Sequence, residues 1–521
     1  MRREREMKRI LTIIIGMICV WMVARATVPP RIRKTGAAAS VPTYRAPWNI
    51  PSRRLGSQLD APLYSIGLQR VPVVLVDFAD LPFSVAKDKD TVHQFYDLYC
   101  NGTRDGVLYQ GAGSYGAVRD YFVLQSDSLF LPEFEIVGPV TLERSYAYYG
   151  KNTASGKDRN RDAFVTDAVT KAQLLTDWNT FDNDGDGVVD MIYFIYAGEG
   201  ENGSDDENTI WPHEQTSQRT IAGVKFGAYA CCNEVYEGVA DGIGVMCHEL
   251  MHALGMPDLY DSSEKAYGMD YWDIMDTGCY CQSSYHPCGL SAYERDFMGW
   301  RRLVLLQRDE VANLTLLPIS KGGVGYKMLS AENQHEYYIV ENRQNIGWDK
   351  YIGRGTDEHQ RHGLMISHVD YSIGRWSYNN VNTTADHQCF TIIPADGESY
   401  SFAHTETQED YNHWERSADA DLFPGSLGVT YLFSRDQPLY TSSGSMHQPI
   451  TGIVEHPDGT VTLTVCLFAD VNGDGLADSQ DVLKVYEYMQ KQTSVEPLIP
   501  QDVNGDGVVD TQDVLQIYNN F

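Results

Sequence analysis

The stretch that decides the fold of this chain reads Val245-Met246-Cys247-His248-Glu249-Leu250-Met251-His252-Ala253-Leu254-Gly255-Met256-Pro257-Asp258. On a helix, His248 and His252 project from one face because they stand four residues apart, and both imidazoles can hold one metal ion. Glu249 lies beside them and can reach a metal-bound water. Gly255 lets the backbone turn away from the helix, so that Asp258 can supply a third ligand. Two neutral nitrogens, one carboxylate and an open position suit a catalytic zinc better than a structural zinc.

A second motif follows closely and reads Tyr271-Trp272-Asp273-Ile274-Met275-Asp276-Thr277-Gly278. We expect its Met275 to form the apolar floor of the metal pocket, as the methionine turn of metzincin-type zinc peptidases does. A methionine taken alone is most often an ordinary core residue. Because Met275 lies between the histidine motif and the segment 291–300, we favour its role as the floor of the metal pocket over that of an ordinary core residue.

Further segments, spread from residue 71 to residue 465, resemble the M6 family of secreted bacterial metallopeptidases, the immune inhibitor A type. The matching stretches keep the order of that family and comprise residues 71–80, 114–122, 181–190, 210–213, 338–344, 347–349 and 423–425. The resemblance implies a zinc endopeptidase made as a secreted precursor. It also implies that His248, His252 and Asp258 bind the zinc and that Glu249 is the general base.

The expected reaction is hydrolysis of peptide bonds in extracellular proteins by a zinc-bound water. Glu249 would take the proton of that water and deliver it to the leaving amine. We expect His213 and Glu214 either to line the cleft or to form a buried pair, and Tyr271 or Tyr280 to stabilise the oxyanion.

Two other functions fit parts of the sequence. One is a calcium-dependent scaffold or adhesion protein with an inactive peptidase fold, and the complete set of metal ligands argues against it. The other is a zinc hydrolase that acts on glycans instead of peptides. It would require a sugar-binding aromatic platform, which is not recognisable here, although the 33 tyrosines leave room for one.

The C-terminal segment carries two calcium-binding loops of the EF-hand type. Each has oxygen ligands at positions 1, 3, 5, 9 and 12, glycine at position 6 and a backbone carbonyl at position 7, and the second loop begins 32 residues after the first. The expected ligands are Asp470, Asn472, Asp474, Leu476, Asp478 and Asp481 in the first loop, and Asp502, Asn504, Asp506, Val508, Asp510 and Asp513 in the second. The eight loop carboxylates would repel one another without calcium, so we expect calcium binding and folding to be coupled.

Aspartate at position 12 and one helix after each loop resemble a type I dockerin module. The expected apolar helix positions are Val482, Leu483, Tyr486 and Met489, then Val514, Leu515 and Tyr518. The resemblance implies a cohesin-type partner, and the partner-binding residues would be Ser479, Gln480, Thr511 and Gln512. A calcium-stabilised structural cap without a partner is the alternative.

A third loop of this kind precedes an apolar, β-prone segment at residues 191–196. Its aspartates are Asp182, Asp184, Asp186 and Asp190, but Tyr193 takes position 12. We expect a calcium ion or a carboxylate-capped turn there, leading into a buried strand.

Charge and the N-terminal sequence indicate an exported protein. A formal net charge of -30 argues against nucleic acid as a partner. Basic residues 1–9, an apolar run over 10–23 and the sequence Ala24-Arg25-Ala26 predict a signal peptide that is cleaved after Ala26. The apolar run is short for a bilayer, which needs about 20 residues. We therefore expect no transmembrane anchor after signal removal, and a bacterial protein that is secreted or associated with the cell surface.

The cysteines are less informative. Nine remain after signal removal, so at least one thiol is expected to be free or joined to another chain. Cys279, Cys281 and Cys288 crowd the methionine turn and suggest a disulfide there. A second zinc is the alternative, although their spacing lacks the paired knuckles of structural zinc sites. Cys247 is expected to be a buried packing residue.

A chain of 521 residues exceeds the size at which single cores stop growing, so several domains are expected. The fold class we infer is an α+β metzincin-like zinc peptidase domain, followed by a β-sandwich domain and a small all-α dockerin-like calcium module. The boundaries are a signal peptide at 1–26, a linker or pro-segment at 27–65, the metallopeptidase catalytic domain at 66–301, the β-sandwich domain at 302–467 and the dockerin-like calcium-binding domain at 468–521. Within them we expect a buried strand over 71–78, and helices over 91–99, 162–175 and 242–254. His368 is expected to be structural.

Overall fold

The computed structural model describes residues 24–26, 61–85, 88–103, 114–154, 158–204, 206–236, 238–261, 265–307, 311–330, 333–357, 359–432, 440, 448–467, 469–471, 476–491, 503 and 508–518. The chain divides into two compact units. Unit 1 consists of residues 1–258, 282–286 and 377–379, and unit 2 of residues 259–281, 287–376 and 380–521.

A mixed seven-stranded sheet forms the centre of unit 1. Its order is β1-β5-β6-β4-β2-β3, with β7 paired to β6, and β6, β4, β2 and β3 run parallel. Strand β2 is the expected strand, and its residues 71–78 are buried without interruption, as in a strand covered on both faces. The bounds are β1 (Ala24–Ala26), β2 (Gly67–Phe78), β3 (Phe130–Leu142), β4 (Val189–Glu199), β5 (His213–Ile221), β6 (Val224–Tyr236) and β7 (Val239–Ala240).

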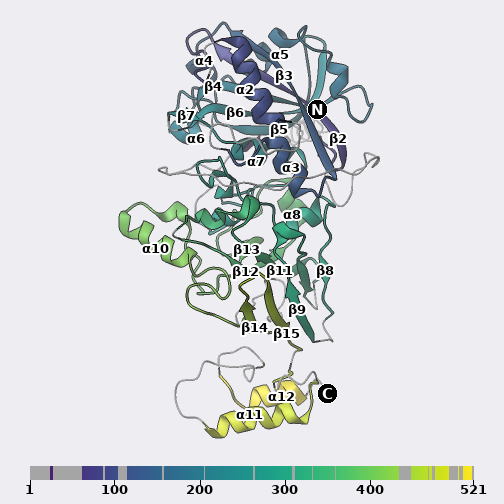
Figure 1. Ribbon diagram of the computed structural model, residues 1–521, viewed down its shortest axis with the longest axis vertical. Coiled ribbons are helices and arrows are strands. Elements are labelled where there is room, and N and C mark those ends of the chain that lie inside the picture. Colours follow the sequence, from purple (N-terminus) through teal and green to yellow (C-terminus); the bar gives the residue numbers. More distant parts are fainter. Residues whose placement is uncertain are drawn as a thin grey trace, which may run out of the picture. The chain divides into compact units, whose positions relative to one another are not determined.

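Helices cover both faces of this sheet (Figure 1). On β4, Phe194 packs against Phe164 of α5 with ring centroids 5.6 Å apart. Tyr193 points to the opposite face, since neighbouring strand residues alternate, and burial together with Cys232 and Glu249 raises its pKa well above the ordinary value. The helices are α2 (Lys89–Asn101), α3 (Val118–Gln125), α4 (Tyr146–Gly150), α5 (Arg161–Ala172), η2 (Trp178–Phe181), α6 (Glu201–Ser204) and α7 (Gly244–Ala253).

Unit 2 contains two further sheets. One has five strands in the order β13-β12-β11-β10-β8, and the other three in the order β14-β15-β9. Both contribute to one apolar cluster, in which Tyr338 and Ile366 of the larger sheet join Ile450 and Val461 of the smaller one. The strands are β8 (Val304–Leu305), β9 (Ala312–Leu316), β10 (Tyr326–Leu329), β11 (Glu336–Arg343), β12 (Gly363–Asp370), β13 (Phe390–Ile392), β14 (Ile450–Glu455) and β15 (Val461–Val465).

Short helices and turns connect these strands. They are η3 (Asp270–Trp272), η4 (Thr277–Tyr280), α8 (Ala292–Phe297), η5 (Ile319–Lys321), η6 (Gly347–Asp349), η7 (Ile352–Arg354), α9 (Ile373–Ser377), η8 (Phe402–His404) and α10 (Gln408–Ala418). At the end of β11, Arg343 is fully buried and pairs with Glu341 at 2.9 Å and with Asp349 of η6 at 2.6 Å. His368 is buried on β12 and contacts Glu336 at 3.0 Å, which agrees with the structural role expected for it.

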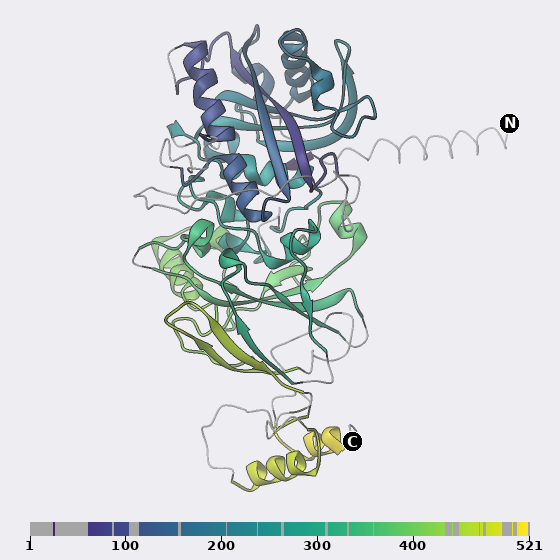
Figure 2. The same cartoon turned by 45° about the vertical axis from the view of Figure 1, so that its right-hand side comes forward.

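The C-terminal repeats form two helices, α11 (Ser479–Lys491) and α12 (Thr511–Tyr518), which lie side by side in both ribbon views (Figure 1 and Figure 2). Their small core includes Val485 and Ile517. The helix expected after each loop is therefore confirmed, and Leu483, Tyr486, Leu515 and Tyr518 lie on the exposed sides of the two helices. Residues of the loops complete the core, among them Val471, Val503 and Val509.

Two expectations concern the cysteines and the membrane. The disulfide expected at the methionine turn is not formed: Cys279, Cys281 and Cys288 are buried, and no disulfide joins them or the other described cysteines. Cys247 is buried on α7, as expected. Within the part of the chain that the structure describes, no helix combines the length and hydropathy that a bilayer crossing requires.

Candidate active site

Helix α7 carries the histidine motif at the centre of unit 1. All of its residues are buried, in agreement with a sequence that is apolar around most of the helix. A hydrogen bond fixes the first residue of α7: the Gly244 amide donates to the Ser284 carbonyl at 2.9 Å. A side chain at Gly242 would place Cβ 2.1 Å from the carbonyl carbon of Ser284, so this close approach requires glycine. The helix therefore begins at a fixed position.

The end of α7 turns as the sequence predicts. Gly255 takes a φ of 99°, a conformation that favours glycine, and the Met256 amide donates back to the Met251 carbonyl at 3.0 Å. The turn brings the Met256 carbonyl within 2.8 Å of Nδ1 of His252. Because a carbonyl only accepts, Nδ1 must carry the proton, which leaves the lone pair of Nε2 for a metal.

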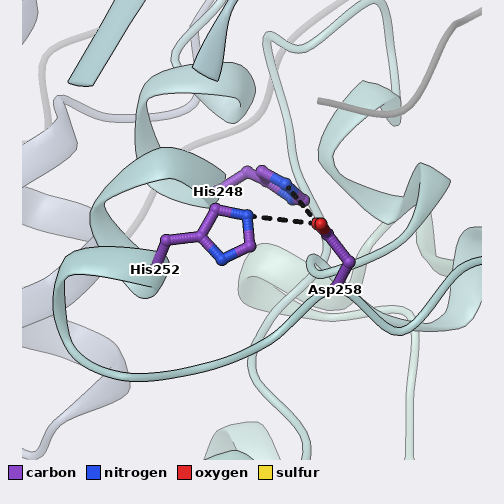
Figure 3. Close-up of side chains that lie close together, drawn as sticks. All are labelled: His248, His252 and Asp258. Carbon is purple, nitrogen blue, oxygen red and sulfur yellow. Dashed lines mark ion pairs between the residues drawn. The ribbon is translucent and has the colours of Figure 1, made fainter. Parts of the chain in front are cut away.

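His248, His252 and Asp258 converge on one point (Figure 3). Each imidazole Nε2 lies 3.1 Å from Oδ1 of Asp258, and the two rings are nearly perpendicular. All three side chains are buried. Two imidazole nitrogens and one carboxylate oxygen are the donor set of a catalytic zinc site, so the residues present fit that ion.

Asp258 is oriented by Asn379, a residue 121 positions away that the sequence did not indicate. The Asn379 Nδ2 donates to Oδ2 of Asp258 at 2.5 Å, and its Oδ1 accepts from the Asp258 amide at 2.6 Å. Asn379 has a φ of 53°, where asparagine is one of the few tolerated residues.

Replacing Asn379 by glycine should weaken zinc binding about 10- to 100-fold, the usual effect of removing a partner that orients a ligand. Glycine keeps the backbone conformation and removes only the two hydrogen bonds. A competition titration with a chelating dye measures the affinity. Asn160→Gly, which removes a hydrogen bond to Tyr148 elsewhere in unit 1, serves as the control, and an unchanged zinc affinity in Asn379→Gly would count against an orienting role.

Glu249 is fully buried on α7, one residue from His248. His213 and Glu214 are both buried and form hydrogen bonds to other residues, Glu214 accepting from the Thr216 hydroxyl at 2.7 Å. The His213 Nδ1 lies 2.7 Å from the Trp211 carbonyl and Nε2 lies 3.0 Å from the Tyr229 hydroxyl. Burial lowers the pKa of His213 to about 3, so the ring is neutral near pH 7.

The methionine turn belongs to unit 2. Met275 is fully buried, its amide donates to Oδ1 of Asp273 at 2.8 Å, and its carbonyl accepts from the Leu259 amide at 2.9 Å. The methionine turn is therefore hydrogen-bonded to Leu259, which directly follows Asp258 in the sequence. Tyr271 and Tyr280 are buried too, and Tyr271 packs edge-on against Phe402.

The loop at Asp182, Asp184 and Asp186 brings one carboxylate oxygen of each residue within 4.8 Å of the others. Its carboxylates accept from backbone amides inside the loop, as Oδ1 of Asp182 does from Gly185 at 2.8 Å. Asp190 instead accepts from the Asn183 amide at 3.0 Å, and burial raises its pKa to about 6. The loop leads into β4, as expected.

The two C-terminal loops share one hydrogen-bond pattern. Asp481 Oδ2 accepts from the Asp478 amide at 2.7 Å, and Asp513 Oδ2 accepts from the Asp510 amide at the same distance. Both position-12 carboxylates are fully buried, and Asp470 is buried as well. Leu476 and Val508 are described, whereas the remaining expected ligands Asn472, Asp474, Asp502, Asn504 and Asp506 lie outside the described residues.

Two segments of the chain match models of known domain families. Residues 66–302 match the immune inhibitor A peptidase M6 catalytic domain, and residues 468–521 match the dockerin type I domain. Over 271 residues, the chain is 25% identical to the pre-pro-metalloprotease PrtV of Vibrio cholerae serotype O1, covering 44% of this chain and 29% of that protein. Over 290 residues, it is 23% identical to immune inhibitor A of Bacillus thuringiensis subsp. alesti, covering 46% of this chain and 42% of that protein.

The chain thus spans less than half the length of the curated relatives it matches. The matched regions contain the histidine motif and both C-terminal loops. Residues 66–302 are thus similar to the catalytic domain of the M6 metallopeptidases of the immune inhibitor A type, and residues 468–521 are similar to the type I dockerin domain.

Proposed function

We propose that this chain is a zinc-dependent endopeptidase that hydrolyses peptide bonds of extracellular proteins. The observation that carries the proposal is the convergence of His248, His252 and Asp258, each Nε2 lying 3.1 Å from the Asp258 carboxylate. When bound, zinc supplies a Lewis acid that acidifies water and polarises the scissile carbonyl. The similar protein PrtV is named a metalloprotease, and residues 66–302 match the peptidase model of the immune inhibitor A type. Both similarities support a metal-dependent peptidase.

Glu249 is the general base in this proposal. A carboxylate next to His248 on α7 can take a proton from the attacking water and return it to the leaving amine. His252 is held in the ligating tautomer by the Met256 carbonyl, and Asn379 holds Asp258. The roles of Met275 as the floor of the pocket and of a tyrosine at the oxyanion are part of the proposal.

A chelator experiment tests this function directly. We expect the secreted protein to digest casein, the digestion to stop after dialysis against a zinc chelator, and zinc to restore it with calcium held constant. The alternative function, a calcium-dependent scaffold or adhesion protein with an inactive peptidase fold, predicts no digestion at any zinc concentration. Digestion that persists in metal-free protein would refute both zinc chemistry and the inactive scaffold.

The finer architecture and the remaining metal sites belong to the same proposal. We assign a metzincin-like catalytic domain to residues 66–301, a β-sandwich to 302–467 and an all-α calcium module to 468–521. Calcium is assigned to the two C-terminal loops and to the loop beginning at Asp182. Ser479, Gln480, Thr511 and Gln512 would contact a cohesin-type module. Residues 1–26 would direct export from a bacterial cell, and the mature protein would be secreted or held at the cell surface.

A further inference from the structure

Unit 2 contains a second group of metal-binding side chains, remote in sequence from the histidine motif. Asp370 ends β12, His387 lies shortly before β13, and Cys389 directly precedes β13. One ligand atom of each lies within 4.8 Å of the others. Among the described residues, Cys389 is the one cysteine that belongs to such a group. We propose that Asp370, His387 and Cys389 form a second binding site for zinc or a zinc-like transition-metal ion.

The sheet register brings these residues together. Val369 pairs with Phe390 in the antiparallel ladder, so the residues next to them, Asp370 and Cys389, face each other across the two strands. The Asp370 amide donates to the Cys389 carbonyl at 2.8 Å, which extends the ladder by one bond. His387 then reaches Asp370 from the incoming chain, with Nε2 2.7 Å from Oδ2. The site is thus fixed by backbone pairing.

Burial and exposure at the group suit a bound ion. Cys389 is buried and the Asp370 side chain is 11% exposed, whereas the His387 side chain is 34% exposed and stacks on Tyr440 with ring centroids 4.1 Å apart. Burial raises the pKa of the Cys389 thiol to about 11, with Arg375 acting against this shift and Asp370 and Glu336 adding to it. A metal ion that binds here would displace the thiol proton.

The donor set selects the class of metal. Thiolate and imidazole ligands favour zinc and its neighbours in the first transition row, whereas calcium and magnesium take oxygen ligands. Nitrogen and oxygen ligands of one tetrahedral zinc lie roughly 3.3 Å apart. The 2.7 Å between His387 and Asp370 would have to open by several tenths of an ångström. The partly exposed His387 side chain can make that movement.

An ion at this position would stabilise the segment that leads away from the third ligand of the active site. Asn382 donates to the Leu259 carbonyl at 2.6 Å, and the Gly268 amide donates to Oε1 of Gln388 at 2.7 Å. Leu259 follows Asp258 directly, and Asn379 precedes Asn382 by three residues. Within unit 2, the proposed ion therefore braces a segment that is hydrogen-bonded to Leu259 and to Gly268.

Cobalt substitution of the full-length protein tests the proposal without relying on activity. Cobalt(II) bound to a thiolate gives a sulfur-to-metal charge-transfer absorption in the near ultraviolet. The ligands His248, His252 and Asp258 include no sulfur, so this band reports the second site alone. We expect the band in the wild type, about two zinc equivalents per chain by elemental analysis, and an unchanged band in His248→Ala.

Cys389→Ser should remove the band and lower the zinc content to about one equivalent. Cys466→Ser is a matched control, because Cys466 is also a buried free thiol but lies beside Thr451 and outside any metal-binding group. His387→Ala should weaken cobalt binding at least about tenfold. Its control is His413→Ala. His387 stacks on Tyr440, and His413 likewise stacks on Tyr400 and pairs with Glu398 at 2.8 Å, but it belongs to no group of potential metal ligands among the described residues.

Asp370→Asn provides a second test if Cys389→Ser does not fold. Asparagine keeps a hydrogen bond to His387 but removes the negative charge of the carboxylate. A weaker or absent band in Asp370→Asn, with an unchanged circular dichroism spectrum, supports the site. No band in wild-type protein, or a band that survives Cys389→Ser, overturns the proposal. Loss of proteolysis with the band intact would instead count only against the proposed peptidase function.

Discussion

Glu249→Gln is expected to lower kcat/KM for peptide hydrolysis by about 10²- to 10⁴-fold while zinc stays bound, because glutamine cannot accept the proton of the attacking water. The side chain is buried on α7 next to His248, and glutamine has almost the same volume. Helix packing should therefore survive the change. Initial rates on a fluorogenic peptide and zinc content by elemental analysis measure the two quantities in one preparation. Glu249→Ala should also abolish hydrolysis and retain zinc.

The control for this experiment is Glu143→Gln, which changes an exposed carboxylate paired with Lys171 in the same unit. It should leave both the rate and the zinc content unchanged. Retained activity in Glu249→Gln would refute the assignment of the general base. A simultaneous loss of zinc would point to a structural role in the metal site instead.

Calcium removal is expected to unfold residues 468–521 while the rest of the chain stays folded. The module has a small core, and the buried carboxylates Asp470, Asp481 and Asp513 lie near it. Without a cation, the repulsion between loop carboxylates exceeds what so few apolar contacts can offset. Hydrogen exchange of the full-length protein, followed by mass spectrometry in zinc-saturated, calcium-free buffer, should show peptides from α11 and α12 fully exchanged at the earliest time point.

Calcium should restore protection of α11 and α12, and peptides from β15 provide the internal control because they should not respond. Asp481→Asn and Asp513→Asn should each raise the calcium concentration needed for half protection by at least about tenfold, since each removes a ligand charge from one loop. Equal protection of α11 with and without calcium would contradict coupled folding. In that case the module would be a conventional helical pair.

The local motifs could be predicted because their residues are close in sequence. A helix places His248 and His252 on one face from their spacing alone, and Gly255 supplies the turn that brings Asp258 back. The C-terminal loops are equally local, and the two repeats show the same Asp478 and Asp510 hydrogen bonds. The strand at 71–78 was recognisable because a continuous apolar run of that length suits a central parallel strand.

The disulfide expected at the methionine turn failed for a different reason. The proximity of Cys279, Cys281 and Cys288 in sequence suggested a disulfide, yet none joins these residues. Cysteine spacing along the chain does not record the distance and orientation of the thiols in the folded protein.

The histidine motif, the turn after it and the two repeated C-terminal loops could be recognised from sequence, since each depends on backbone geometry over about a dozen residues. The contact between Asn379 and Asp258, 121 positions apart, became visible only in the folded chain. The same holds for the position of Asp370 opposite Cys389 on β12 and β13. Such contacts depend on strand register and on long loop closures, which bring together residues whose spacing follows no periodic rule.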